Sequence, residues 1–258
     1  MRLHVEGAGR VVMLHGVAGS ARTYSWLQLP AVRFDFRGHG ASDRAPGTYL
    51  LEHYVEDALS VLDGAGPAVL AGHSLGGVVA WTVAQRRPDL VTGLVLEDPP
   101  LFMGEPPEHD RNPAIPAFVE MRANAARWQE AGAPPEQVAR ELAASRFVDG
   151  RTFADIQTDE ALYARGYALT HLDLEVLDRV VDGSVLASTD TTSPVDVRTL
   201  IIAADDAVGA AFPTAHAARL SATHPEVEVI RLPGASHTIH DERAYRDEWV
   251  RLLTSRVG

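Results

Sequence analysis

The chain has 258 residues, of which 46% are hydrophobic and 22% charged, and this balance indicates one large globular domain with a full core. Its formal net charge of −12 argues against nucleic acid or an anionic membrane as a main partner. The absence of cysteine excludes disulfides and thiolate chemistry, and the absence of lysine excludes a Schiff-base mechanism.

The amino-terminal segment and the apolar runs bear on location. Residues 1–10 contain no apolar run long enough for a signal peptide, and the later apolar runs are shorter than a membrane span. We therefore expect a cytoplasmic protein, monomer or homodimer, that acts on a small-molecule substrate. We expect no nucleic-acid partner and no membrane partner.

The first hundred residues alternate between strand and helix patterns. Short apolar runs predict buried strands, and the longer stretches between them have helical periodicity. The alternation indicates a parallel sheet with helices on both faces. The predicted strands are 11–14, 31–36, 67–71 and 91–96, and the predicted helices are 51–62 and 78–87.

The strand pattern stops between residues 101 and 194. Helical stretches interrupted by prolines take its place, at 117–130, 135–145, 159–169 and 174–181. An insertion of roughly 90 residues is far longer than an ordinary loop, so we expect a functional lid. The alternation then resumes with strands at 199–204 and 226–232 and helices at 214–221 and 242–256. The sequence thus predicts a core domain of residues 1–100 and 195–258 and a helical cap of residues 101–194.

A Gly-x-Ser-x-Gly turn, Gly72-His-Ser74-Leu-Gly76, joins the strand at 67–71 to the helix that follows it. The order of strand, tight turn and helix is the context of a nucleophile elbow, although a serine that only caps the helix has the same pattern. A nucleophilic serine needs a histidine base. His237 follows the last predicted strand, so we expect it at the same sheet edge as Ser74.

Four motifs together resemble the α/β-hydrolase superfamily: His15-Gly16, the segment Asp35-Phe-Arg-Gly-His-Gly-Ala-Ser-Asp43, the turn Gly72–Gly77 and Gly234-Ala-Ser-His237. The resemblance implies an α/β fold with a doubly wound, mostly parallel sheet and a helical lid inserted after the sixth strand. It also implies Ser74 as the nucleophile, His237 as the general base and an oxyanion hole built from the backbone N–H groups of Val17 and Leu75.

The other polar residues of these motifs receive structural roles. His15 is expected to orient its own loop, and residues 37–43 to shape the turn after the second strand. His240 lies three residues after His237, but neither a glutamate nor a third histidine accompanies it at metal spacing. We expect His240 behind the site or at the surface, and we expect neither a metal nor a cofactor.

The acid that orients His237 has two candidate positions. The superfamily most often places it after the strand that follows the lid, where the usual spacing falls on Ala207, so Asp205 or Asp206 would need a shortened loop. Relatives resembling the haloalkane dehalogenases and their luciferase kin place it after the preceding strand, which gives Asp98. The sequence favours Asp98 and leaves Asp205 as the alternative acid.

The residue at the elbow narrows the chemistry. Haloalkane dehalogenases and epoxide hydrolases carry an aspartate there, whereas Ser74 indicates acyl transfer. A carboxylic ester or lactone of a moderately apolar small molecule fits best. A carbon–carbon bond hydrolase or thioesterase, or a receptor-like binding protein with slow turnover, remains as the alternative. The lid supplies apolar and aromatic residues, most of them expected in its own core: Leu101, Phe102, Met103, Ile115, Phe118, Met121, Trp128, Phe147, Phe153, Tyr163 and Tyr167.

Overall fold

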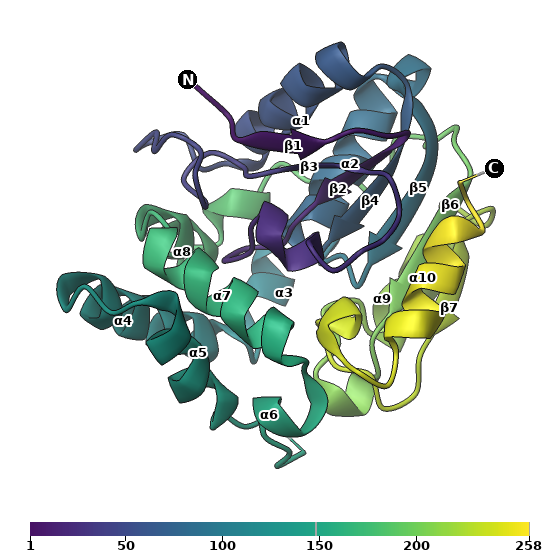
Figure 1. The fold of residues 1–258 in the computed structure, drawn as a ribbon. Helices are drawn as coiled ribbons and strands as arrows, with labels where there is room; N and C mark the ends of the chain where they lie inside the picture. The colour runs from purple at the N-terminus through teal and green to yellow at the C-terminus, as the bar shows by residue number, and fades with distance from the viewer. Residues whose placement is uncertain (148, 258) are drawn as a thin grey trace.

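A seven-stranded sheet forms the centre of the computed structural model, which describes residues 1–147 and 149–257 (Figure 1). The strand order is β1-β3-β2-β4-β5-β6-β7; β1 pairs antiparallel with β3, and the other pairs are parallel. This confirms the prediction of a doubly wound, mostly parallel sheet. The strands are β1 Val5–Gly7, β2 Val11–Leu14, β3 Val32–Phe34, β4 Ala68–His73, β5 Val91–Glu97, β6 Thr199–Ala203 and β7 Glu228–Arg231.

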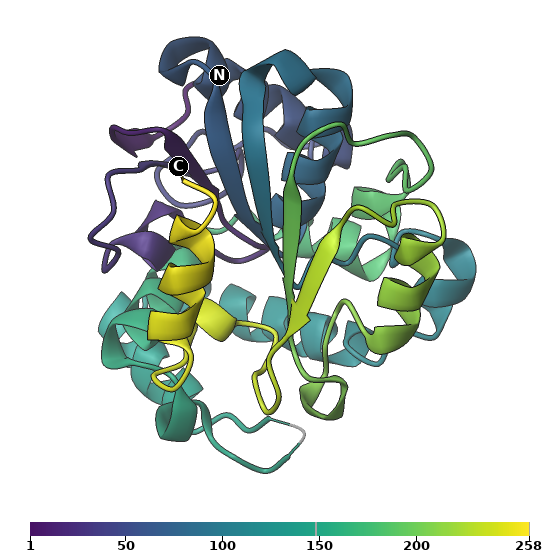
Figure 2. The same cartoon turned by 90° about the vertical axis from the view of Figure 1, so that its right-hand side faces the viewer.

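The central strands are buried on both faces because helices cover the sheet from both sides. One face packs against α1 (Leu51–Ala65) and α2 (Leu75–Arg86). The other packs against α10 (Arg246–Thr254), whose Trp249 is buried against it. Figure 2 shows α10 and α9 (Thr214–Ser221) on opposite sides of the sheet.

The helices between β5 and β6 lie beyond one end of the sheet (Figure 1), and we call them the lid after the prediction above. The expected position of this insertion, after the sixth strand, is wrong. Only five strands form before it among the described residues, so it follows β5. The lid helices are α3 Pro106–Asp110, α4 Ile115–Glu130, α5 Pro135–Ala143, α6 Phe153–Ile156, α7 Asp159–His171 and α8 Glu175–Val181.

The lid has a core of its own that continues into the main one. Trp128 of α4, Val138 of α5 and Leu169 of α7 are buried in the same cluster as the residues of α1 and α2. The helices α5 and α7 approach closely at Gly166, where a Cβ atom would lie 2.4 Å from the carbonyl oxygen of Pro135. Most of the lid residues expected in this core are buried or half-buried, whereas Tyr163 is exposed.

Backbone hydrogen bonds join the lid to the segment that follows His237. The N–H of Thr158 donates to the carbonyl of Asp241 at 3.1 Å, and the N–H of Arg243 donates to the carbonyl of Ile156 at 2.9 Å. Between these two bonds, the Gln157 amide donates to the Thr238 hydroxyl at 3.0 Å. This flank of the lid is therefore fixed to the core directly behind His237.

No helix in the described part of the chain combines the length and the apolar composition that crossing a bilayer requires.

The elbow glycines are required by close approach of the backbone. A Cβ atom at Gly76 would lie 2.1 Å from the carbonyl oxygen of Leu14, a backbone atom that cannot move aside. We expect Gly76→Ala to lower the free energy of unfolding by about 3 kcal/mol. Gly64 of α1 has no atom within 4 Å of such a Cβ, so Gly64→Ala should raise stability by about 0.5–1 kcal/mol. Urea denaturation measures both, and unchanged stability in Gly76→Ala would contradict this reading.

Candidate active site

Ser74 lies at the sharp turn between β4 and α2. Its backbone has φ 52° and ψ −119°, a region that residues with a side chain rarely adopt. Its N–H donates to the carbonyl of Glu97 at 2.9 Å, which fixes the turn to the end of β5. The Ser74 side chain makes no capping hydrogen bond to α2, so the helix-cap alternative is wrong. This geometry is that of a nucleophile elbow.

Asp98 lies directly after β5 and contacts His237. Its Oδ2 lies 2.7 Å from Nδ1 of His237, and its carboxylate is fully buried. Three backbone N–H groups also donate to this carboxylate: those of Ala204 at 3.1 Å, Ala211 at 2.7 Å and Phe212 at 3.1 Å. These bonds fix the carboxylate, and it orients the imidazole with the proton on Nδ1.

The alternative acids are engaged elsewhere. Asp205 accepts hydrogen bonds from the N–H of Gly234 at 2.6 Å and of Ala207 at 2.9 Å, and these bonds lower the pKa of its carboxyl. Asp206 accepts from the N–H of Thr214 at 3.1 Å and pairs with Arg231. Neither contacts His237 in the described structure. The structure therefore gives Asp205 no contact with His237, so its role as the alternative acid stays a prediction, and its bond to Gly234 holds the loop carrying His237.

Ser74 and His237 are held near each other through His73. The Nε2 of His73 lies 3.0 Å from the carbonyl oxygen of His237, and the centres of the two rings are 4.7 Å apart. Burial is the main cause that holds the pKa of His73 well below its usual value, so its ring is neutral and donates this bond. No hydrogen bond joins Ser74 Oγ to His237 among the described residues; in unliganded enzymes such bonds are often long and shorten when substrate binds.

The two N–H groups expected to bind an oxyanion lie beside the elbow. In the described part of the chain, neither Val17 nor Leu75 donates its N–H to another residue. Gly16 keeps the loop close, because a Cβ atom there would lie 3.1 Å from Cβ of Ser74 and 2.6 Å from Nδ1 of His73.

Backbone strain is concentrated at the same edge of the sheet. Outside glycine, the described residues with positive φ are Ala18 at 57°, Ser74 at 52° and Asp98 at 43°. They follow β2, β4 and β5, three neighbouring strands, at their carboxyl ends. Strain gathered at one place in this way is typical of a functional site.

His15 and Asp35 support the loop that carries Val17. His15 Nδ1 donates to the carbonyl of Gly16 at 2.8 Å, and its Nε2 accepts from the N–H of Phe36 at 3.1 Å. Burial lowers the pKa of His15 to about 4, so the ring stays neutral. Asp35 accepts from the N–H of Ala21 at 2.6 Å. The contacts of His15 agree with the structural role expected for it, and Asp35 adds a second support of this loop.

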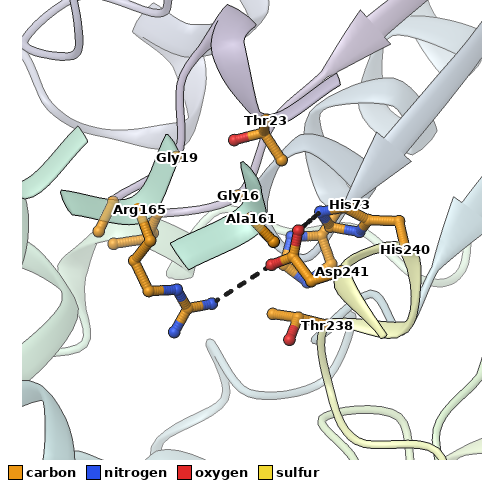
Figure 3. Close-up of a pocket in the computed structure, with 11 residues that line it drawn as sticks. Gly16, Gly19, Thr23, His73, Ala161, Arg165, Thr238, His240 and Asp241 are labelled. Atoms are coloured by element: carbon orange, nitrogen blue, oxygen red, sulfur yellow. Dashed lines mark ion pairs between the residues drawn. The ribbon is translucent and has the colours of Figure 1, made fainter. Parts of the chain in front are cut away.

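Glu97 and His240 form a buried pair that the sequence reading missed. The Nδ1 of His240 lies 2.8 Å from Glu97 Oε2, and its Nε2 lies 3.4 Å from Oδ1 of Asp241. His240 is 1% exposed, so it lies behind the site and not at the surface. Burial alone would lower the pKa of His240, but the carboxylates of Glu97 and Asp241 outweigh it and raise that pKa. Figure 3 shows His240 beside Asp241.

This pair makes stability depend on pH. Because the folded protein raises the pKa of His240 above 6.5, the pair stabilises the fold fully below about pH 6.5 and loses that contribution as pH rises through the raised pKa. The double variant Glu97→Gln/His240→Gln removes both charges. We expect the difference in unfolding free energy between wild type and this variant to fall as pH rises above about 6.5, by about 1.4 kcal/mol for each unit by which the folded protein raises the pKa of His240. A difference that stays constant or grows with pH in urea denaturation would refute the pairing.

No group of three or more histidine or carboxylate side chains placed to hold a metal ion occurs among residues 1–147 and 149–257.

Curated relatives match parts of this chain. Lipase LipV of Mycobacterium tuberculosis is 38% identical over 109 residues, which cover 38% of this chain and 41% of that protein. Epoxide hydrolase B of the same organism is 41% identical over 98 residues, 33% of this chain and 27% of its own length. The chain thus spans less than half the length of these two relatives. An sn-1-specific diacylglycerol lipase of Mus musculus is 25% identical over 257 residues, 90% of this chain and 76% of that protein.

Solved structures share the fold over nearly the whole chain. An N-formylmaleamic acid deformylase from Pseudomonas putida S16 superposes with a TM-score of 0.75 at 17% identity, covering 98% of this chain and 96% of the other. An enol-lactonase from Burkholderia xenovorans LB400 gives 0.70 at 18% identity, with 99% and 95% covered. The model described as the Alpha/beta hydrolase family matches residues 11–250. The resemblance seen in the sequence is thereby confirmed, and the chain belongs to the alpha/beta hydrolase family.

Proposed function

We propose that this protein is a serine hydrolase that cleaves a carboxylic ester or lactone of a small molecule through an acyl-enzyme on Ser74. The observation that carries the proposal is the 2.7 Å contact between His237 Nδ1 and the buried Asp98 carboxylate, beside a serine held in elbow geometry. A carboxylate that fixes one ring nitrogen as a donor leaves Nε2 free to act as a base.

The reaction proceeds in two halves. His237 Nε2 takes the hydroxyl proton of Ser74 as Oγ bonds to the substrate carbonyl carbon, and the N–H groups of Val17 and Leu75 bind the resulting oxyanion. The bond to the alkoxy leaving group breaks, and His237 returns the proton to it. Water, deprotonated by the same ring, then attacks the acyl carbon. The bond from that carbon to Ser74 Oγ breaks, His237 returns the proton to Oγ, and the acid is released.

Two features support acyl transfer. The elbow carries a serine, which forms an ester intermediate that water opens at its carbonyl carbon. The relatives and structural neighbours include a protein named as a lipase and one named as an enol-lactonase.

Hydrolysis of p-nitrophenyl butyrate tests the proposal. We expect steady release of p-nitrophenol that depends on Ser74, and an acyl-enzyme visible by intact-protein mass after rapid acid quenching. A burst of one equivalent without turnover would instead indicate a receptor-like protein. Cleavage of a ring-fission diketone or a thioester, with no activity on the oxygen ester, would replace the ester proposal with another hydrolytic reaction.

A further inference from the structure

A small cavity with both polar and apolar lining lies beside the elbow (Figure 3). Its volume is about 30 Å³, and its wall includes Val17 of the oxyanion loop, Arg165 of the lid helix α7 and Asp241. Ser74 and His237 do not line it, but their chain neighbours His73 and Thr238 do. The cavity therefore borders the loop that carries the Val17 N–H and the residues that flank Ser74 and His237 in the chain.

Arg165 offers its donors to this cavity. Its guanidinium pairs with Asp241 at 3.9 Å, which is beyond hydrogen-bond distance, and lies 5.4 Å from the centre of the Phe153 ring. The side chain is 22% exposed. Among the described residues, the five N–H donors of the Arg165 guanidinium make one ion pair, with Asp241, and no hydrogen bond. Figure 3 shows Arg165 extending toward Asp241 and Thr238.

His240 presents a second donor to the cavity. Its Nδ1 is held by Glu97, and its Nε2 is buried without a hydrogen-bond partner among the described residues, 3.4 Å from Oδ1 of Asp241. In the protonated ring, which the carboxylates of Glu97 and Asp241 favour, Nε2 carries a proton and is a donor. The cavity wall also carries the side chains of Thr23 and Thr238. Asp241 is the one carboxylate among the residues lining the cavity in the described structure, and it lies 3.9 Å from the Arg165 guanidinium and 3.4 Å from His240 Nε2. A buried donor without an acceptor is costly, so a ligand that accepts from His240 Nε2 and pairs with the Arg165 guanidinium is bound favourably.

The size of the cavity limits what it can take. One water needs about 10–15 Å³ measured in this way, so the cavity accommodates about two water-sized groups. The two oxygens of a carboxylate meet both this limit and the fork of a guanidinium. A longer apolar acyl chain does not fit.

We propose that this cavity is a subsite for a carboxylate of the substrate, bound by Arg165 with His240 Nε2 and the threonine hydroxyls. The substrate is accordingly a half-ester or lactone of a dicarboxylic acid, with its free carboxylate a few bonds from the carbonyl that Ser74 attacks. This inference rests on the proposed ester or lactone hydrolysis. It replaces the moderately apolar substrate expected from the lid composition.

Hydrolysis of monoethyl succinate and ethyl butyrate, followed by pH-stat titration, tests the subsite. The two esters differ by a carboxylate in place of a methyl group. We expect wild type to prefer monoethyl succinate at least tenfold in kcat/KM. Arg165→Met should lower kcat/KM for monoethyl succinate 10- to 100-fold, mostly by raising KM. The same variant should change kcat/KM for ethyl butyrate less than threefold. Arg165→Lys should restore part of the loss. Arg140→Met makes the same charge change on the exposed face of α5 and should alter neither ester.

Binding of succinate to the Ser74→Ala protein, measured by calorimetry, gives a readout independent of turnover. We expect binding that Arg165→Met abolishes and Arg140→Met retains. Ser74-dependent cleavage of ethyl butyrate without a preference for the charged ester would overturn the subsite and leave the proposed function standing. Arg165-dependent binding of succinate with no cleavage of either ester would overturn the proposed function and leave the subsite standing. Absence of succinate binding would overturn the subsite in any case.

Discussion

Ser74→Ala is expected to lower kcat for p-nitrophenyl butyrate by about 10⁴-fold or more, because the nucleophile and its proton are lost together. The remaining rate would come from the oxyanion donors and from binding alone. KM should change little, since a Cβ atom is kept and the strained turn is fixed by the bond from Ser74 N–H to Glu97.

Ser236→Ala is the matched control for this variant. Ser236 precedes His237, and its hydroxyl is buried without a partner among the described residues, so the same chemical change there should keep activity within about twofold. Labelling with a fluorophosphonate gives a second measurement: wild type and Ser236→Ala gain the mass of one adduct, and Ser74→Ala gains none. Wild-type activity in Ser74→Ala would contradict the proposal of an acyl-enzyme on Ser74.

Asp98→Asn is expected to lower kcat by about 10³- to 10⁴-fold. An amide at this position can donate from its NH₂ group to His237 Nδ1. The ring then carries its proton on Nε2, where it cannot take the proton of Ser74. The substitution also brings an NH₂ group toward the backbone donors that bond the carboxylate, among them the N–H groups of Ala204 and Phe212. The unfolding midpoint is therefore measured beside activity.

Asp205→Asn separates the two acids. Asp205 holds the N–H of Gly234 and lies in the loop after β6, so its substitution should loosen the His237 loop modestly and reduce kcat less than tenfold. If Asp205→Asn proved the more damaging of the two variants, Asp98 would be excluded as the partner of His237 in catalysis.

The choice between Asp98 and Asp205 depends on features of the fold that have no local signal in the sequence. Both follow parallel strands, and β5 and β6 are neighbours in the sheet, so both lie at one edge. What separates them is the positive φ of Asp98 and the N–H donors from the loop after β6 that converge on its carboxylate. Neither the dihedral angle nor the convergence of donors from residues more than a hundred positions away has a local sequence signal.

Long-range pairing explains the missed residues as well. Glu97 and His240 are 143 positions apart, and each looks like an ordinary loop residue in its own segment. Their partners become visible only when β5 and the loop after β7 meet. Their positions in the chain give one hint. Glu97 directly precedes Asp98, and His240 is the third residue after His237, so both lie near motif residues at the same sheet edge.

Element boundaries could likewise be predicted from local patterns but not from contacts between distant residues. The long periodic segments gave α1, α2, α4 and α7 to within a few residues. The three-residue β1 and the short α3 and α6 were missed because so few residues show no period. The last helix begins at Arg246 and not at 242, because Glu242 instead accepts the N–H of Ser236 and is buried in the His237 loop.

The bonds between the lid and the segment behind His237 have a consequence for exchanging lids among relatives. The carbonyl of Ile156 and the N–H of Thr158 each pair with main-chain atoms of residues 241–243. A transplanted lid must reproduce this extended stretch in register, or buried polar groups next to the base lose their partners. The lid of this protein is therefore not a free-standing module, and new specificities are better sought by replacing side chains of α4, α5 and α7 than by grafting.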